Sequence, residues 1–122
     1  MPRTRVVFYR ELDGSVPLLE WLDSLPERVR RRCIVRIERL RELGHELRRP
    51  EADLLRDNIY ELRVGVSGTN YRMLYFFHGN VAAVVSHGLE KERVVPPAEI
   101  DLAIERRRRF IAAPASHTHE EE

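Results

Sequence analysis

The chain has 122 residues, of which 43% are hydrophobic and 34% are charged, and its formal net charge is +1. This length supports one domain around one core and excludes a large two-domain cofactor enzyme. The near-neutral charge argues against a protein that coats DNA over its whole surface, although it leaves room for a local basic patch.

Cysteine content and hydrophobicity indicate where the protein works. Cys33 is the only cysteine, so no internal disulfide can form, and its place among apolar helix positions predicts a buried, unreactive thiol. No segment is long and apolar enough to span a membrane, and the first residues lack the layout of a signal peptide. We therefore expect a soluble, cytoplasmic protein that does not bind membranes.

The first half of the chain predicts one strand and two helices. Residues 5–9 are β-branched and aromatic, which is typical of a strand. Ser15 then favours the start of a short helix with Pro17 in its first turn. A longer helix runs from Pro26 to about Leu43, with a buried stripe at helical spacing. Its stripe consists of Val29, Cys33, Ile37 and Leu40.

The second half predicts a polar loop over residues 45–57, then three strands over 59–64, 69–77 and 81–89. Short turns join these strands, so they form an antiparallel meander. A last helix follows the two prolines at 96 and 97, with Ile100, Ala103, Ile104 and Ile111 on one stripe. Residues 113–122 are polar and predict a disordered tail.

These elements predict an α+β fold in a single domain over residues 1–112. We expect a small antiparallel sheet made of the N-terminal strand and the three-stranded meander. The two N-terminal helices must pack on one face of this sheet to bury their apolar stripes, which leaves the other face less covered. The C-terminal helix completes the fold.

Arginine supplies nearly all the positive charge, since Lys91 is the only lysine. The planar guanidinium group donates two parallel hydrogen bonds and therefore suits phosphate, although a GC-rich genome also favours arginine codons. The outer face of the second helix is rich in arginine, and we predict RNA contacts there. Solvation of this face and contact with an acidic partner remain open alternatives. The residues predicted to contact RNA are Arg31, Arg32, Arg36 and Arg39.

Two arginines stand in the middle of predicted strands, where charge is uncommon unless it is paired or the face is open. Strand alternation places Arg63 on one face with Glu61, so a structural reading pairs Glu61 with Arg63 or Arg72 across the strands. The functional reading makes Arg63 and Arg72 the floor of an anion site, with Lys91 and His87 reaching in. Alternation also places His87 on one face with Ala83 and Val85.

A site of arginines, one lysine and one histidine suits phosphoryl chemistry without a metal or another cofactor. RNA brings its own nucleophile, the 2′-hydroxyl group, so the protein needs cations for the charged transition state and a group that transfers protons. Arginine cannot be the base, because its pKa exceeds about 12. Lys91, His87, Tyr71 or Tyr75 would transfer the proton. The chain contains no Walker A loop, no dinucleotide-binding glycine pattern and no zinc-type cluster.

The sequence resembles the phage-derived, HigB-like branch of the RelE/ParE toxin superfamily. The matching segments are Trp21-Leu22-Asp23-Ser24-Leu25-Pro26, Ile59-Tyr60-Glu61-Leu62-Arg63, Tyr71-Arg72-Met73-Leu74-Tyr75-Phe76, His87-Gly88-Leu89-Glu90-Lys91, and Pro97 with Glu99-Ile100. The chain departs from this pattern after Lys91, where Glu92 and Arg93 replace a lysine and a threonine.

The resemblance implies a RelE-like fold and the toxin of a type II toxin–antitoxin module, which cleaves mRNA on the ribosome through a 2′,3′-cyclic phosphate. Arg63 and Arg72 would bind the scissile phosphate, Lys91 would be the general base or an electrostatic catalyst, and His87 would be catalytic or structural. The implied partners are the ribosome, mRNA and a cognate antitoxin with a helix-turn-helix domain. The alternative is a non-catalytic module of the same fold, either a ParE-like gyrase poison or an inactive co-repressor that binds the antitoxin.

Overall fold

The computed structural model describes residues 3–79, 82–90 and 93–121, which form a six-stranded sheet with helices on both faces. Two short 3-10 helices lie at Gly44–Glu46 and Pro114–His117. The main elements in chain order are β1 (Arg5–Tyr9), α1 (Pro17–Asp23), α2 (Glu27–Leu43), β2 (Ala52–Arg56), β3 (Ile59–Val66), β4 (Thr69–His78), β5 (Ala82–Glu90), α3 (Pro97–Ala112) and β6 (Thr118–His119).

The sheet is mixed, with the strand order β2-β3-β4-β5-β1-β6. The meander β3–β4–β5 is antiparallel as predicted, whereas β1 pairs with β5 in parallel. The expectation of a small, purely antiparallel sheet was therefore wrong in detail, while the α+β class is confirmed. The physical reason is the long connection through α1 and α2, because a helical crossover lets two strands run in the same direction side by side.

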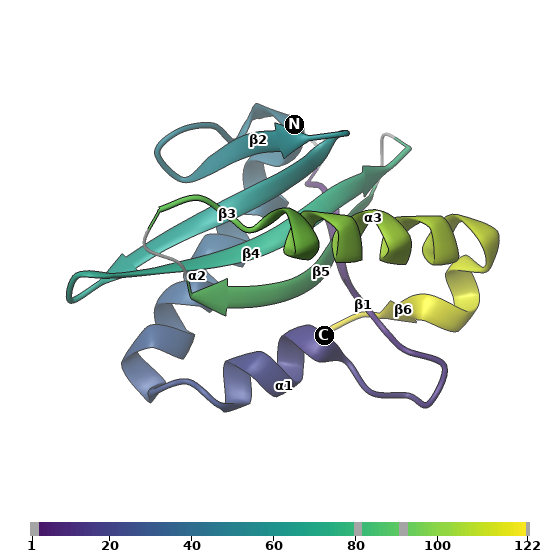
Figure 1. Ribbon diagram of the computed structural model, residues 1–122, viewed down its shortest axis with the longest axis horizontal. Helices are drawn as coiled ribbons and strands as arrows, with labels where there is room; N and C mark the ends of the chain where they lie inside the picture. The colour runs from purple at the N-terminus through teal and green to yellow at the C-terminus, as the bar shows by residue number, and fades with distance from the viewer. Residues whose placement is uncertain (1–2, 80–81, 91–92, 122) are drawn as a thin grey trace.

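Helices cover both faces of the sheet, as Figure 1 shows, with α3 in front and α1 and α2 behind. The core behind the sheet includes Cys33 and Leu40 of α2. The front core joins Phe76 of β4 to Phe110 of α3, whose rings meet edge to face with centroids 5.9 Å apart. The front face, which we expected to be less covered, is thus closed by the C-terminal helix.

Strand β2 occupies a segment that we predicted to be a loop. It pairs antiparallel with β3 and forms one edge of the sheet, with an irregular register near Leu54. The hairpin turn consists of Asp57 and Asn58, both with positive φ (51° and 61°), as tight hairpin turns require. Only Ala52 of this strand is buried, so the apolar alternation that reveals a strand is missing.

The C-terminal segment, expected to be a disordered tail, instead folds against β1. Strand β6 pairs with β1 through the register Phe8↔His119 and Tyr9↔Thr118. The ring of His117 stacks on that of Tyr9 at 5.0 Å, and Arg5 donates two hydrogen bonds to Glu120. The prediction was wrong because it relied on the polar composition of this segment. Backbone hydrogen bonds form between strands regardless of side-chain polarity, and here they cover the outer edge of β1.

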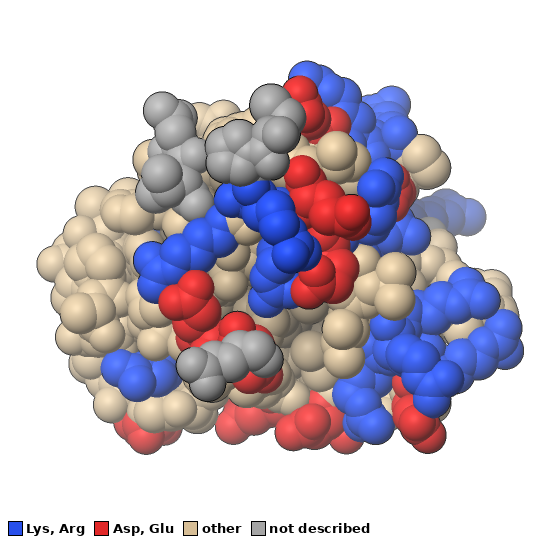
Figure 2. All heavy atoms as spheres, turned by 180° about the vertical axis from the view of Figure 1, so that it is seen from behind, with Lys and Arg blue, Asp and Glu red and all other residues tan. Residues whose placement is uncertain are grey.

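The side covered by α1 and α2 carries both signs of charge, and basic side chains gather over the N-terminal part of α2, at the lower right of Figure 2. Among the residues that the structure describes, no helix is both long and apolar enough to cross a membrane.

Candidate functional site

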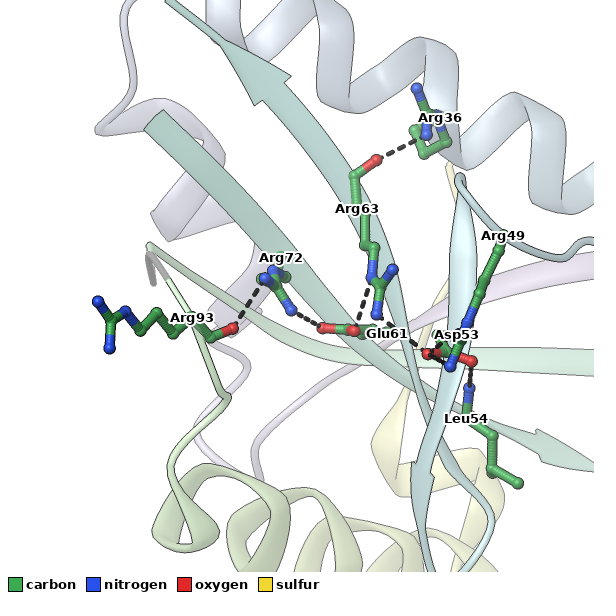
Figure 3. A network of polar contacts seen from close by, with 8 residues as sticks. All are labelled: Arg36, Arg49, Asp53, Leu54, Glu61, Arg63, Arg72 and Arg93. Atoms are coloured by element: carbon green, nitrogen blue, oxygen red, sulfur yellow. Dashed lines mark hydrogen bonds and ion pairs between the residues drawn. The ribbon is translucent and has the colours of Figure 1, made fainter. Parts of the chain in front are cut away.

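Glu61 joins the two strand arginines on the face of the sheet that α3 covers. Arg63 and Arg72 are direct partners in the β3–β4 register, and Glu61 lies two residues before Arg63. The carboxylate of Glu61, only 1% exposed, accepts hydrogen bonds from Arg63 Nε at 2.8 Å and Arg72 Nη1 at 2.5 Å. Both contacts appear in Figure 3. Glu61 thus pairs with both arginines, where the structural reading expected a pair with one or the other.

Further hydrogen bonds fix the orientation of each guanidinium group (Figure 3). Arg63 also donates to Asp53 of β2 at 3.0 Å, and Arg72 donates to the backbone carbonyl of Arg93 at 2.9 Å. Arg36 of α2 donates to the carbonyl oxygen of Arg63 at 2.6 Å. The site thus ties together three strands, one helix and the segment before α3.

Acidic groups next to this network are held in their charged form. A hydrogen bond from Arg49 lowers the pKa of Asp53, and the Leu54 N–H and the charge of Arg63 act in the same direction. A hydrogen bond from Arg39 likewise lowers the pKa of Glu51. These carboxylates stay ionised at neutral pH, so they position the arginines through charge-assisted hydrogen bonds.

The two strand arginines line one pocket of about 530 Å³ at the β3–β4 hairpin. Its charged lining consists of four arginines and a single acid, namely Arg36, Arg63, Arg72, Arg93 and Glu51. The side chain of Arg63 is 36% exposed and that of Arg72 is 11% exposed. An anion in this pocket would therefore meet a net positive lining of preorganised guanidinium groups.

The structure holds His87 under α3, and His87 is not part of this pocket's lining. A register shift pairs Leu74 with His87 but Tyr75 with Val85, so Ser86 is an extra residue in β5. This bulge reverses the alternation, which corrects the prediction that His87 shares a face with Val85. The ring lies within hydrogen-bond distance of the Ser86 hydroxyl (2.8 Å) and the Glu99 carboxylate (3.0 Å).

Burial lowers the pKa of His87, and the charge of Arg106 lowers it further, while Glu99 opposes both. The neutral imidazole is therefore the favoured form beneath α3. Its contacts indicate a residue that anchors α3 to the sheet.

The remaining candidates for proton transfer differ in their positions. Lys91 lies outside the described residues, although Glu90 on one side of it pairs with Tyr71 and Arg93 further along lines the pocket. Tyr71 also lines the pocket. Tyr71 and Tyr75 both belong to the core behind the sheet, but Tyr75 does not line the pocket, and burial raises its pKa.

Three of the four arginines predicted to contact RNA come together on α2. Arg31, Arg32 and Arg36 line a second pocket of about 330 Å³, together with Arg28. Arg39 instead donates two hydrogen bonds to Glu51, at 2.9 and 3.1 Å. The guanidinium group of Arg39 thus binds the loop before β2 and does not line this second pocket.

The prediction did not include Arg28, Arg93, Asp53 or Arg49 among the site residues. Arg28 belongs to the same arginine-rich face, so its spacing relative to Arg32 was a usable signal. The other three reach the site from segments without a regular pattern, and only the packing of those segments brings them there.

Residues 20–108 match the family model of the phage-derived protein Gp49-like family. The chain belongs to this family. The matched segment contains both arginine-lined pockets and ends before the C-terminal segment that pairs with β1. No curated protein sequence matches the chain at a significant level. Within the described part of this Gp49-like chain, no group of three His, Cys, Asp or Glu side chains could hold a metal ion.

Proposed function

We propose that this Gp49-like protein is the toxin of a type II toxin–antitoxin module and that it cleaves mRNA on the ribosome. One observation carries the proposal: Arg63 and Arg72 face each other across two strands, share the buried Glu61 and line a single basic pocket. This geometry suits a phosphodiester group, because planar guanidinium groups bind phosphate oxygens through parallel hydrogen bonds.

In the proposed reaction, the ribose 2′-hydroxyl attacks the adjacent phosphorus and the 5′-oxygen leaves, which yields a 2′,3′-cyclic phosphate. Arg63 and Arg72 stabilise the negative charge of the transition state, a contribution worth about 3–4 kcal/mol for one preorganised donor. Proton transfer falls to Lys91 or to Tyr71, which lines the pocket.

The proposed partners follow from this activity. The toxin would bind the ribosome and mRNA in the cytoplasm, and an antitoxin with a helix-turn-helix DNA-binding domain would neutralise it. The exposed arginines Arg31 and Arg32 of α2 suit either the phosphates of ribosomal RNA or acidic antitoxin side chains.

A second candidate function is a non-catalytic module of the same fold, which poisons gyrase or serves as an antitoxin-binding co-repressor. The observation that favours it is the carboxylate of Glu61, which already neutralises part of the charge on both strand arginines. An incoming phosphate would have to compete with this carboxylate for their donors.

The two functions are separated by inducing the native protein and its variants in cells and mapping mRNA ends by primer extension. The test variants are Arg63→Ala, which leaves Arg72 paired with the buried Glu61, and Arg72→Lys, which keeps a cation beside that carboxylate at the more deeply buried of the two arginines. The control is Arg56→Ala, which removes an exposed arginine paired with Asp101 on the surface. We expect cleaved mRNA for the native protein and the control, and about 100-fold less cleavage for Arg63→Ala.

Arg72→Lys keeps the charge but loses the planar fork, so we expect cleavage to fall as well. Native-level cleavage by both test variants would refute the assigned roles. Intact mRNA with DNA damage after induction would support a gyrase poison, and intact mRNA without growth arrest would support the co-repressor.

A further inference from the structure

The N-terminal half of α2 and the end of β3 enclose a pocket whose charged lining is entirely basic. Its lining residues are Arg28, Arg31, Arg32, Val35, Arg36, Val64 and Gly65. The basic surface over this part of α2 is visible at the lower right of Figure 2. Such a concentration of positive charge is unexpected in a chain whose net charge is only +1.

The stability of the fold does not explain the presence of these arginines at the N-terminal half of α2. The N-terminus of a helix carries partial positive charge, so cations in the first turns of α2 oppose the helix dipole. Arg28 also lies three and four residues from Arg31 and Arg32, a spacing at which like charges destabilise a helix. The ion pair between Arg31 and Glu27 offsets little, because both side chains are more than 70% exposed.

Most other arginines of the described chain have a carboxylate partner. For example, Arg3 and Arg41 both contact Glu38, and Arg49 contacts Asp53. In contrast, no ion pair within the described residues joins Arg28 or Arg32 to an acid. Their donors are thus free for an external anion.

This basic pocket adjoins the pocket of the strand arginines, because both are lined by Arg36, Val64 and Gly65. We propose that the α2 pocket binds a second phosphate of the same RNA strand, so that the protein holds RNA at two points on either side of Arg36. This inference deepens the proposed function and rests on it for the identity of the polymer.

An RNA backbone is the ligand that these observations favour. It carries a negative charge at every nucleotide, which matches two adjoining basic pockets that together hold seven arginines and one acid. The exposed apolar side chain of Val35 beside the guanidinium groups offers contact surface to a sugar or a base. The alternative ligand is a carboxylate-rich protein segment, and the experiment below distinguishes it from RNA.

The test measures binding of a fluorescent 2′-O-methyl RNA of about 12 nucleotides, which resists cleavage through the 2′-hydroxyl and is long enough to span both pockets. The test variant is Arg28→Ala/Arg32→Ala. The matched control is Arg30→Ala/Arg48→Ala, which also removes two arginines without a described acid partner; Arg30 lies on the other side of α2, in a groove with Leu19 and Ile34. Both double variants lose the same charge.

We expect the test variant to bind at least ten-fold more weakly at 0.1 M salt. The slope of log K against log salt should become shallower by about 0.7, since the variant loses one phosphate contact on a single strand. The control should bind this RNA with the affinity and the salt dependence of the native protein. The test variant should unfold at the same or a higher urea concentration than the native protein, because it removes a repulsive cluster.

Three outcomes would overturn the inference. Equal losses in both double variants would show a general effect of net charge, and unchanged binding by the test variant would show that no second site exists. Tighter binding of a poly-glutamate peptide than of RNA, lost only in the test variant, would assign the pocket to an acidic protein. This RNA cannot be cleaved, so the binding experiment is independent of the cleavage experiment in cells. The proposal of a second phosphate site can therefore be refuted while mRNA cleavage is observed, and it can be supported when no cleavage is observed.

Discussion

Glu61 is the residue on which the orientation of both site arginines depends. Its carboxylate is buried to 1% exposure and contacts Arg63 and Arg72 at once. A buried carboxylate is tolerated only with such partners, since an uncompensated charge inside a protein is costly. The same contact that keeps the arginines in place also reduces the positive charge that they offer to a phosphate.

His87 shows how a neighbouring bulge changes the role of a residue. Because Ser86 is an extra residue in β5, His87 turns toward α3 and contacts Glu99 at the start of that helix. Burial and the nearby Arg106 favour the neutral ring. A histidine that resembles a catalytic residue in the sequence thus acts as a contact between sheet and helix.

This environment predicts a pH-dependent stability. The pKa of His87 is lowered on folding, so the unfolded chain binds a proton more readily than the native protein. The contribution of His87 is complete above about pH 6.5, the ordinary histidine pKa, and declines as the pH falls below it. Urea unfolding between pH 7.5 and 5.5 should show this loss, and His87→Gln should show a smaller loss over the same range. An identical pH dependence in the variant would contradict the assignment.

Helix α1 and strand β5 meet at a glycine that allows close approach. A Cβ atom on Gly88 would lie 2.1 Å from Cε3 of Trp21, well inside van der Waals contact. Trp21 also lies near Tyr71, with ring centroids 6.4 Å apart. Two segments that matched the toxin resemblance separately, one around Trp21 and one around Gly88, are therefore in direct contact.

Gly88→Ala should destabilise the protein by about 1–3 kcal/mol, because the indole ring of Trp21 cannot move without disturbing the core. Gly65→Ala is the matched control, since a Cβ atom there would come no closer than 3.9 Å to its nearest neighbour, Asn70. We expect the control to unfold within about 0.5 kcal/mol of the native protein. Urea titration followed by tryptophan fluorescence measures both variants, and equal stabilities would exclude a tight α1–β5 contact.

The whole molecule depends on two cores separated by the sheet. The core behind the sheet contains Cys33, whose burial raises its thiol pKa to about 11. The core in front depends on α3 and its Phe110. Each face of the sheet is covered by one helical layer, so loss of either layer would expose apolar side chains of the central strands.

Cys33 offers a direct probe of this arrangement. Because the thiol is buried and largely protonated at pH 8, we expect native protein to react with a thiol reagent far more slowly than unfolded protein. The reaction should accelerate with urea in step with global unfolding, since α2 must leave the sheet to expose the sulfur. Fast labelling of protein whose tryptophan fluorescence is still native would show that α2 opens locally.

The sequence alone determined the α+β class, the three helices, the meander and the buried cysteine, because each depends on the local periodicity of apolar residues and on prolines, glycines and turn residues. It also indicated Arg63, Arg72 and the basic face of α2, since charge inside a strand or along one helix face is visible in the spacing.

Only the tertiary structure decided how distant segments pair. The parallel contact of β1 with β5, the pairing of β2 with β3 and that of β6 with β1 depend on backbone hydrogen bonds, which carry no side-chain pattern. The bulge at Ser86 that turns His87 toward α3 has the same origin. The approach of Arg93 and Asp53 to the strand arginines was likewise decided by packing, because loop and edge residues reach a site only through the elements that carry them.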